Sequence, residues 1–314
     1  MSVKRHLLNW LNHPIAGRLA GLAGAPTRSR AKLGGLSNPF FVSDYLVENG
    51  DITYHAPADS YLNRKSRRSA RVRFSSGAFE PEVQYLMRRI VKPTDIVLDI
   101  GANVGAHTVL LATLAHRGHV YAFEPVAEMA ERNSLNCALN GLDNVTIVRC
   151  GLGAANGVLD MNVNVAGSGF EGTSSFLASA HVVDQPGNYI SRQLPVRRLD
   201  DLVPELGIAG RIGFIKMDTE GFEPLIIDGA RQILAAHRPA MIVEAHTTRL
   251  AKLGRRFAWY RETFPDYHIL LSPEPTPANP FLQLIPLTTE PPEICVNLVL
   301  LPRVRSVSPG AAAV

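Results

Sequence analysis

The sequence predicts a doubly wound α/β fold, and the alternation of apolar runs with helical patterns carries this prediction. Three short apolar runs have the character of buried strands, at residues 95–100, 119–125 and 144–150. Helical patterns separate them, and each ends at a glycine that can take the left-handed conformation, Gly118 or Gly141. Strands joined in this way run parallel with right-handed crossovers, so helices should cover both faces of one mostly parallel sheet.

The same alternation continues on both sides of this core. A helix is expected just before the first strand, at residues 81–91, and an extra strand at 157–163. Further strands are expected at 211–218, 239–246 and 294–302, with helices at 223–237 and 252–264. The order of elements therefore predicts one large sheet rather than two separate domains.

Composition divides the chain into three parts. Residues 1–75 form a basic N-terminal extension, 76–302 the main domain, and 303–314 a tail expected to be disordered. Within the main domain, residues 164–193 are rich in small residues and lack a clear period, which is typical of an insertion that shapes a substrate pocket.

Cysteine content and hydropathy indicate the compartment. The three cysteines are scattered without CxxC spacing, which argues against a disulfide framework or a zinc site. The sequence holds no run of about 18 uncharged apolar residues, the length that a transmembrane helix needs. Both observations favour a protein of the reducing cytoplasm.

The basic charge lies almost entirely near the N-terminus. Residues 1–73 hold 12 Lys and Arg against 4 Asp and Glu, although the whole chain carries a net charge of only +4. The opening segment KRHLLNWLNHP mixes apolar and basic side chains and could make a peripheral membrane contact. The cluster at 64–73 has no interleaved aromatic residues, so we expect a solvated loop and no nucleic-acid partner.

Acidic residues stand at the ends of four predicted strands: Asp99, Glu124, Asp218 and Glu244. In an open α/β sheet, ligands bind outside the carboxyl ends of the strands, so these side chains should meet around one site. After Asp99 the chain turns through DIGANVG, where Gly101 and Gly105 leave the backbone open to a ligand. The pattern predicts a ligand site at this edge.

The charges at this edge indicate which kind of cofactor would bind there. The three-glycine fingerprint of dinucleotide-binding proteins is absent, and Asp99 would repel a diphosphate, which argues against an NAD-dependent oxidoreductase. Glu124 ends the second strand, where a carboxylate can accept the hydroxyls of a ribose. A cofactor with an ammonium group, a ribose and no phosphate fits both acids, and S-adenosylmethionine is such a molecule.

Four segments, VLDIGANVGAHT, VYAFEP, IKMDTEGFEPLIIDGA and MIVEAH, resemble the FkbM-type S-adenosylmethionine-dependent methyltransferases over roughly residues 79–246. The resemblance implies a class I methyltransferase fold, with a seven-stranded sheet that has one reversed strand, and methyl transfer to a hydroxyl oxygen. It also implies a cofactor-binding role for the residues that fall on the family's motifs: Asp99, Gly101, Asn103, Gly105 and Glu124.

Transfer to an alcohol calls for a general base near the cofactor methyl group. Asp218, Glu220 and His246 are the catalytic candidates, because they stand at or just after the ends of two central strands. Alternatively, Glu220 caps a helix and Asp218 holds the cofactor's amino end. Together with Glu244, these residues could also ligate a divalent metal, but their spacing matches no dedicated metal motif and we predict no metal.

The sequence thus predicts an S-adenosylmethionine-dependent O-methyltransferase that acts on a hydroxyl of a sugar, a glycolipid head group or a secondary metabolite. A non-catalytic binding domain of the same fold and an NAD-dependent oxidoreductase remain the alternatives. The acceptor is expected to be a small molecule or a glycan, and the sequence carries no signal for an oligomeric state.

Overall fold

The computed structural model describes residues 44–49, 52–57, 80–165, 174–177, 186–273, 284–292 and 294–303. Of the N-terminal extension it includes only a hairpin of β1 (Asp44–Asn49) and β2 (Ile52–Pro57). The predicted amphipathic opening segment, the basic cluster at 64–73 and nearly all of the predicted tail lie outside the described residues. Within the described part of the chain, no helix combines the length and apolar character that crossing a bilayer requires.

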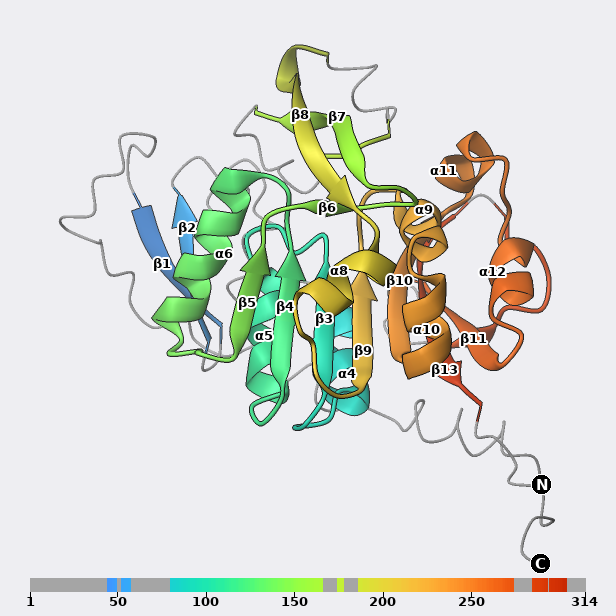
Figure 1. The fold of residues 1–314 in the computed structure, drawn as a ribbon, viewed down its shortest axis with the longest axis horizontal. Helices are drawn as coiled ribbons and strands as arrows, with labels where there is room; N and C mark the ends of the chain where they lie inside the picture. The colour runs from blue at the N-terminus through green and yellow to red at the C-terminus, as the bar shows by residue number, and fades with distance from the viewer. Residues whose placement is uncertain are drawn as a thin grey trace, which may run out of the picture.

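One large sheet organises the molecule (Figure 1). Its strand order is β12-β11-β13-β10-β9-β3-β4-β5. The predicted central strands are present as β3 (Ile96–Ile100), β4 (His119–Phe123), β5 (Val145–Val148), β9 (Ile212–Met217) and β10 (Ala240–His246). The edge beyond them is formed by β11 (Tyr267–Ser272), β12 (Ile285–Pro286) and β13 (Cys295–Pro302).

Most of this sheet is parallel. Strands β5, β4, β3, β9 and β10 pair in parallel, whereas β13 runs antiparallel to both β10 and β11. The doubly wound fold with a reversed strand is therefore confirmed. The strand count differs from the predicted seven, because the two-residue β12 adds an eighth strand at the edge of β11.

Neighbouring residues of each central strand point into opposite cores. Val97 and Phe214 pack with α4 (Pro81–Ile90) and α5 (Ala106–Leu114) on one face. Leu98 and Ile215 pack on the other face, with residues of α8 (Leu199–Glu205), α9 (Glu223–Asp228) and α10 (Arg231–His237). This two-residue alternation buries both faces of the sheet, as a parallel sheet requires.

A second, three-stranded sheet stands above the carboxyl ends of the large one (Figure 1). Its order is β6-β8-β7, formed by β6 (Gly151–Leu152), β7 (Gly157–Asn164) and β8 (Tyr189–Arg197). β7 is the predicted extra strand, but β8 begins inside the stretch 164–193, for which the sequence predicts an irregular insertion. The described part of this stretch is therefore regular at its end.

The chain after β10 also departs from the expected pattern. The helix expected at 252–264 is shorter, α12 (Ala258–Thr263), and a separate helix, α11 (Thr247–Lys252), precedes it. Gly254 lies between them with φ +65°, a conformation that ends a helix and that glycine adopts without strain. The remaining long helix, α6 (Ala127–Leu139), contacts α5 and β5.

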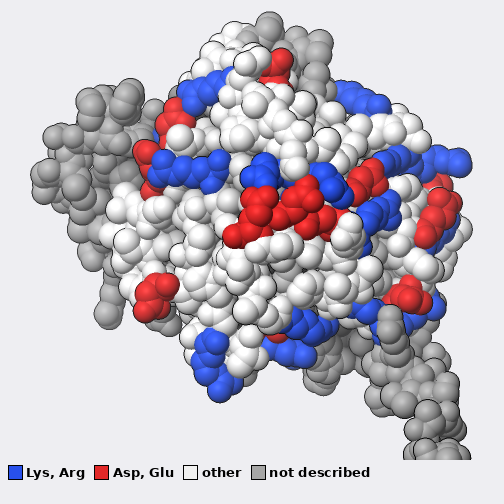
Figure 2. Space-filling view, viewed as in Figure 1, with Lys and Arg blue, Asp and Glu red and all other residues white. Residues whose placement is uncertain are grey.

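Charged side chains form a band across the face that carries α8 (Figure 2). Basic and acidic groups alternate there, and ion pairs join Arg198 to Asp201 at 3.2 Å and Arg197 to Glu205 at 2.6 Å. Because each of these arginines has an acidic partner, the band is not a basic surface of the kind that binds a polyanion.

Candidate active site

The turn after β3 adopts a conformation that its glycines allow. Gly101 and Gly105 have φ values of +77° and +85°, and Asn103 between them is also left-handed at +49°. The backbone N–H groups of Gly101 and Ala102 both donate to the carbonyl oxygen of Phe123, at 3.1 Å. The turn is thereby tied to the carboxyl end of β4, so the two strand ends form one wall.

Asp99 lies beneath this turn and is fully buried. The Thr108 hydroxyl donates to its Oδ2 at 2.6 Å, whereas its Oδ1 has no hydrogen-bond partner among the described residues. Burial raises the pKa of Asp99, and the Lys216 ammonium opposes that shift. A buried carboxylate oxygen without a partner is costly, which is typical of a position that serves a ligand.

Glu124 follows β4 and closes the other side of the turn. Its Oε2 accepts from the backbone N–H of Asn103 at 2.8 Å, and its Oε1 accepts from that of Val126 at 2.9 Å. Burial raises the pKa of Glu124 to about 7, although these two hydrogen bonds favour the ionised form. A carboxylate has about four acceptor positions, so Glu124 retains two for a ligand.

A cavity that is open to solvent, with about 590 Å³ of empty space when its open mouth is included, lies at this edge of the sheet. Gly101, Asn103 and Glu124 line it on one side, and Asp218 and Glu220 line it on the other. Its apolar wall comes from the strand ends, the smaller sheet with the segment beside it, and helices α6 and α9, and includes Phe123, Val126, Met129, Leu152, Met161, Phe176, Phe222 and Ile226. Asp99 and Gly105 support the turn from behind and are not among the lining residues.

The loop after β9 supplies the acidic side of the cavity. Lys216 Nζ lies 3.2 Å from Asp218 Oδ2. Burial alone would raise the pKa of Asp218, but the Lys216 ammonium, together with smaller contributions that include Arg249, outweighs this effect and lowers it. Two residues later, Glu220 has a left-handed backbone at φ +58°, and burial raises the pKa of its carboxyl to about 7 although Arg249 opposes the shift.

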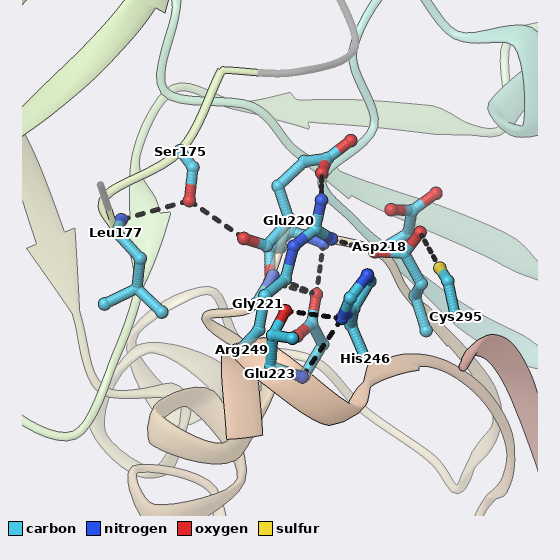
Figure 3. A network of polar contacts seen from close by, with 12 residues as sticks. Ser175, Leu177, Asp218, Glu220, Gly221, Glu223, His246, Arg249 and Cys295 are labelled. Carbon is cyan, nitrogen blue, oxygen red and sulfur yellow. Dashed lines mark hydrogen bonds and ion pairs between the residues drawn. The ribbon is translucent and has the colours of Figure 1, made fainter. Parts of the chain in front are cut away.

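Arg249 joins the acidic groups of two neighbouring strand ends. Figure 3 shows it pointing from α11 toward Glu220, with which it forms an ion pair. Its other terminal nitrogen lies 2.7 Å from Glu244 Oε2. Burial and the neighbouring carboxylates of Asp218, Glu220 and Glu223 raise the pKa of Glu244 well above its usual value, and Arg249 opposes that shift.

Carboxylate oxygens of Asp218, Glu223 and Glu244 lie within 4.8 Å of one another. Asp218 already faces Lys216, and Glu244 faces Arg249. Glu223 accepts from the backbone N–H groups of Thr219 and Gly221, at 2.7 Å and 3.2 Å. Each of the three carboxylates thus already has a partner within the chain: an ammonium, a guanidinium or backbone N–H groups.

His246, the third catalytic candidate, is the N-cap residue of α11. Its Nδ1 accepts from the backbone N–H of Thr248 at 3.2 Å, and the Thr248 hydroxyl lies 2.8 Å from the same atom. Asp218 and Glu220 line the cavity, but His246 is not among its lining residues. The structure thus brings two of the three candidates to the cavity and gives the third a capping position.

Sequence reasoning did not identify Arg249, Glu223 or Ser175 as parts of this site. The Ser175 hydroxyl donates to the carbonyl oxygen of Glu220 at 3.0 Å and connects the smaller sheet to the acidic loop. Glu223 stands in the DTEGFE segment that carried the other acids and could have been proposed from it. Arg249 and Ser175 have no neighbouring motif that marks them.

Comparisons with known proteins find methyltransferases among the relatives of this chain. The chain is 26% identical over 180 residues to the 2-O-methyltransferase NoeI of Sinorhizobium fredii, which covers 52% of this chain and 71% of NoeI. It is 26% identical over 167 residues to the hexuronic acid methyltransferase AglP of Haloferax volcanii, covering 53% of this chain and 62% of AglP. A match of 25% identity to the antimetabolite synthetase AmbE of Pseudomonas aeruginosa covers 51% of this chain and only 9% of AmbE.

Among solved structures, the FkbM methyltransferase of Methylobacillus flagellatus aligns with 18% identity and a TM-score of 0.41, over 72% of this chain and 52% of that one. The model of the methyltransferase FkbM domain matches residues 99–270, which is more than half of the chain and includes the strand-end acids on both sides of the cavity. The chain therefore belongs to the FkbM methyltransferase family, as the sequence segments around these acids predict.

Proposed function

We propose that this protein is an S-adenosylmethionine-dependent O-methyltransferase that acts on a hydroxyl group of a sugar or glycan. The observation that carries the proposal is the cavity between Glu124 and Asp218, which lies at the carboxyl ends of the parallel strands. Class I folds bind their ligands at this edge. The names of NoeI and AglP, a 2-O-methyltransferase and a hexuronic acid methyltransferase, support a sugar as the acceptor.

The residues around the glycine turn fit the cofactor. Gly101 lines the cavity, and the two unused acceptor positions of Glu124 suit the two hydroxyls of a ribose. The unpartnered oxygen of Asp99 provides a hydrogen-bond acceptor beneath the turn, which suits an amino group. When bound there, S-adenosylmethionine would supply an electrophilic methyl group on its sulfonium.

The acceptor side of the cavity is the acidic loop after β9. Glu220 is the stronger candidate for the general base, because its pKa of about 7 is matched to proton abstraction near neutral pH. Asp218 lines the same wall, but the Lys216 ammonium keeps its pKa low, so it is the weaker base and suits the binding of a hydroxyl or an amino group. Holding the acceptor oxygen in line with the methyl group is the other task of this wall.

The other proposals concern the surroundings of the enzyme. Cys137 and Cys150 are free, buried thiols, which supports a reducing compartment such as the cytoplasm. The basic, partly apolar segment that opens the sequence supports a peripheral contact with a membrane that carries a lipid-linked glycan. This segment lies outside the described residues.

The experiment that tests the function is a calorimetric titration with S-adenosylmethionine and S-adenosylhomocysteine, with NAD as the comparison. Saturable binding of the adenosyl compounds alone is expected, and Asp99→Ala or Glu124→Ala should abolish it while the fold persists. Binding that is unchanged in both variants would reject the site. Transfer of a labelled methyl group from S-adenosylmethionine to a panel of neutral, amino and acidic sugars then identifies the acceptor.

A further inference from the structure

Glu220 is held at the cavity wall from both its backbone and its side chain. The Ser175 hydroxyl fixes its carbonyl oxygen, and the same hydroxyl accepts from the backbone N–H of Leu177 at 3.0 Å. Ser175 itself forms a β-bridge with Asn162 of β7, so the smaller sheet supports this contact. The carboxylate of Glu220 is held separately, by the guanidinium of Arg249 (Figure 3).

The position of Arg249 depends on a glycine that packs against it. Gly221 follows Glu220 with φ +103°, and a Cβ atom added to it would lie 2.8 Å from Cδ of Arg249 and 3.0 Å from its Cβ. The absence of a side chain therefore lets the arginine stem lie directly on the backbone that carries Glu220. The side chain of Arg249 is only 17% exposed, so its contacts are largely shielded from water.

Arg249 also has a second anchor on the neighbouring strand. Its Nη1 bonds Glu244 of β10, whose other oxygen accepts a hydrogen bond from the Cys295 thiol at 3.5 Å. A planar guanidinium can hold two carboxylates at fixed positions, which the single ammonium of a lysine cannot do equally well. The arginine therefore fixes Glu220 relative to the sheet itself.

We propose that Arg249 is a positioning residue for methyl transfer, which holds Glu220 at the cavity wall as a carboxylate ready to accept the proton of the acceptor hydroxyl. This inference rests on the proposed function and assigns a role to a residue outside the cavity lining. The proton leaves the acceptor oxygen as that oxygen forms its bond to the methyl carbon, and the carbon–sulfur bond breaks with its electrons on sulfur.

The charges around Glu220 determine in which direction its pKa should change when Arg249 is removed. The charged and titratable groups that act on it are Arg249 of α11, Asp218 after β9, Glu223 of α9, Glu244 of β10 and Cys295 of β13. Burial and the neighbouring carboxylates raise its pKa to about 7, and Arg249 is the cation that opposes them. Loss of this cation should raise the pKa further, so that less of the base is ionised at neutral pH.

The test follows the side-chain carboxyl carbons of ¹³C-labelled glutamates through a pH titration of the full chain, with Glu220 assigned by its loss in Glu220→Gln. We expect a midpoint near 7 in the wild type. In Arg249→Gln the midpoint should rise by about one unit or more, and Arg249→Lys should restore much of the difference. An unchanged midpoint in a folded Arg249→Gln protein overturns the proposal.

Arg255 provides a matched control. It is an arginine of similar exposure that pairs with Asp228 and stacks over Trp259 at 4.2 Å, outside the cavity lining. Arg255→Gln should leave the titration of Glu220 unchanged. If Arg249→Gln does not fold, a pH titration of the wild type still tests the proposal. The guanidinium ¹⁵N signals of Arg249 should shift with the same midpoint as the Glu220 carboxyl carbon. A shift with a different midpoint, or no shift, contradicts the pairing.

Activity gives a second readout once the acceptor is known. The acid limb of kcat/KM should move to higher pH in Arg249→Gln by the same amount as the Glu220 midpoint, while the affinity for S-adenosylhomocysteine stays unchanged. The titration itself needs neither cofactor nor acceptor. Failure of S-adenosylmethionine to bind would therefore reject the proposed function without altering the result for Arg249 and Glu220.

Discussion

Gly101 of the first turn lies against the backbone of Asp218, which follows β9, so closely that no side chain fits between them. A Cβ atom on Gly101 would overlap the Asp218 carbonyl oxygen and lie 2.9 Å from the carbonyl carbon. The Asp218 N–H also donates to the carbonyl oxygen of Ile100 at 3.0 Å. The two sides of the cavity are therefore joined through direct contact of their backbones.

Gly101→Ala should consequently damage both stability and cofactor binding. The substitution adds a steric overlap to the cost of a left-handed backbone at a residue with a Cβ, which is about 1–2 kcal/mol by itself. Gly141→Ala is the control, because Gly141 is also left-handed, at φ +64°, but has no atom within 4 Å of its Cβ position. Chemical denaturation should show a larger loss for Gly101→Ala, and calorimetry a loss of S-adenosylhomocysteine binding in that variant alone. Equal losses of stability would show that the contact relaxes freely.

The buried Thr108 hydroxyl holds Asp99 in place, and its removal should weaken cofactor binding. Thr108 Oγ1 donates to Asp99 and accepts from the Asn133 side-chain amide at 2.9 Å, and all three residues are fully buried. Thr108→Val keeps the shape but leaves two buried polar groups without this partner. We expect a loss of about 1–3 kcal/mol in the free energy of unfolding, measured with urea, and a weaker affinity for S-adenosylhomocysteine.

Thr108→Ser, which keeps the hydroxyl, should retain most of both properties. If Thr108→Val binds the cofactor product as tightly as the wild type, the orientation of Asp99 does not depend on this hydrogen bond. That result would also weaken the assignment of Asp99 to the cofactor amino group.

The raised pKa of Glu124 predicts that cofactor binding releases protons. Its pKa is about 7 in the free protein because of burial, so a large share is protonated at pH 6.5. Ribose hydroxyls that donate to the carboxylate favour the ionised form and lower that pKa, so binding expels the proton. Calorimetry in buffers of different ionisation enthalpy should detect proton release at pH 6.5 and little at pH 8.5.

Glu124→Gln removes the titrating group and should abolish the difference between the two pH values, whatever affinity remains. Proton release of the same size in this variant would assign the titration to another group. Glu220, with a pKa also near 7, is the alternative source.

The acids of this site could be predicted from the sequence because parallel strands align their carboxyl ends. Asp99, Glu124 and Asp218 each follow a short apolar run, so the strand pattern alone places them at one edge. Arg249 could not be found in this way. It lies 29 residues from Glu220 on a short helix, and the glycine that admits its stem looks like any other turn glycine in the sequence.

The parts of the fold that were not predicted have local causes of the same kind. β12 has two residues, too few for any periodic signal. β8 carries Pro195 and two exposed polar side chains, Ser191 and Gln193, so its sequence resembles a loop, and its pairing with β7 decides the structure. The predicted helix at 252–264 has helical spacing, but Gly254 ends the first turn.

His246 allows the capping and catalytic interpretations to be separated by one substitution. The Oδ1 atom of an asparagine can accept from the Thr248 N–H in place of Nδ1, and asparagine is among the best N-cap residues. We expect His246→Asn to fold and to transfer methyl groups at close to the wild-type rate, with Glu220 as the base.

His246→Ala should lose about 1 kcal/mol in the free energy of unfolding, because α11, which carries Arg249, loses its cap. A folded His246→Asn protein that binds S-adenosylhomocysteine but has lost most of its kcat would instead assign the proton transfer to His246. The acid limb of the pH profile would then belong to an imidazole, and Arg249→Gln should leave that limb in place.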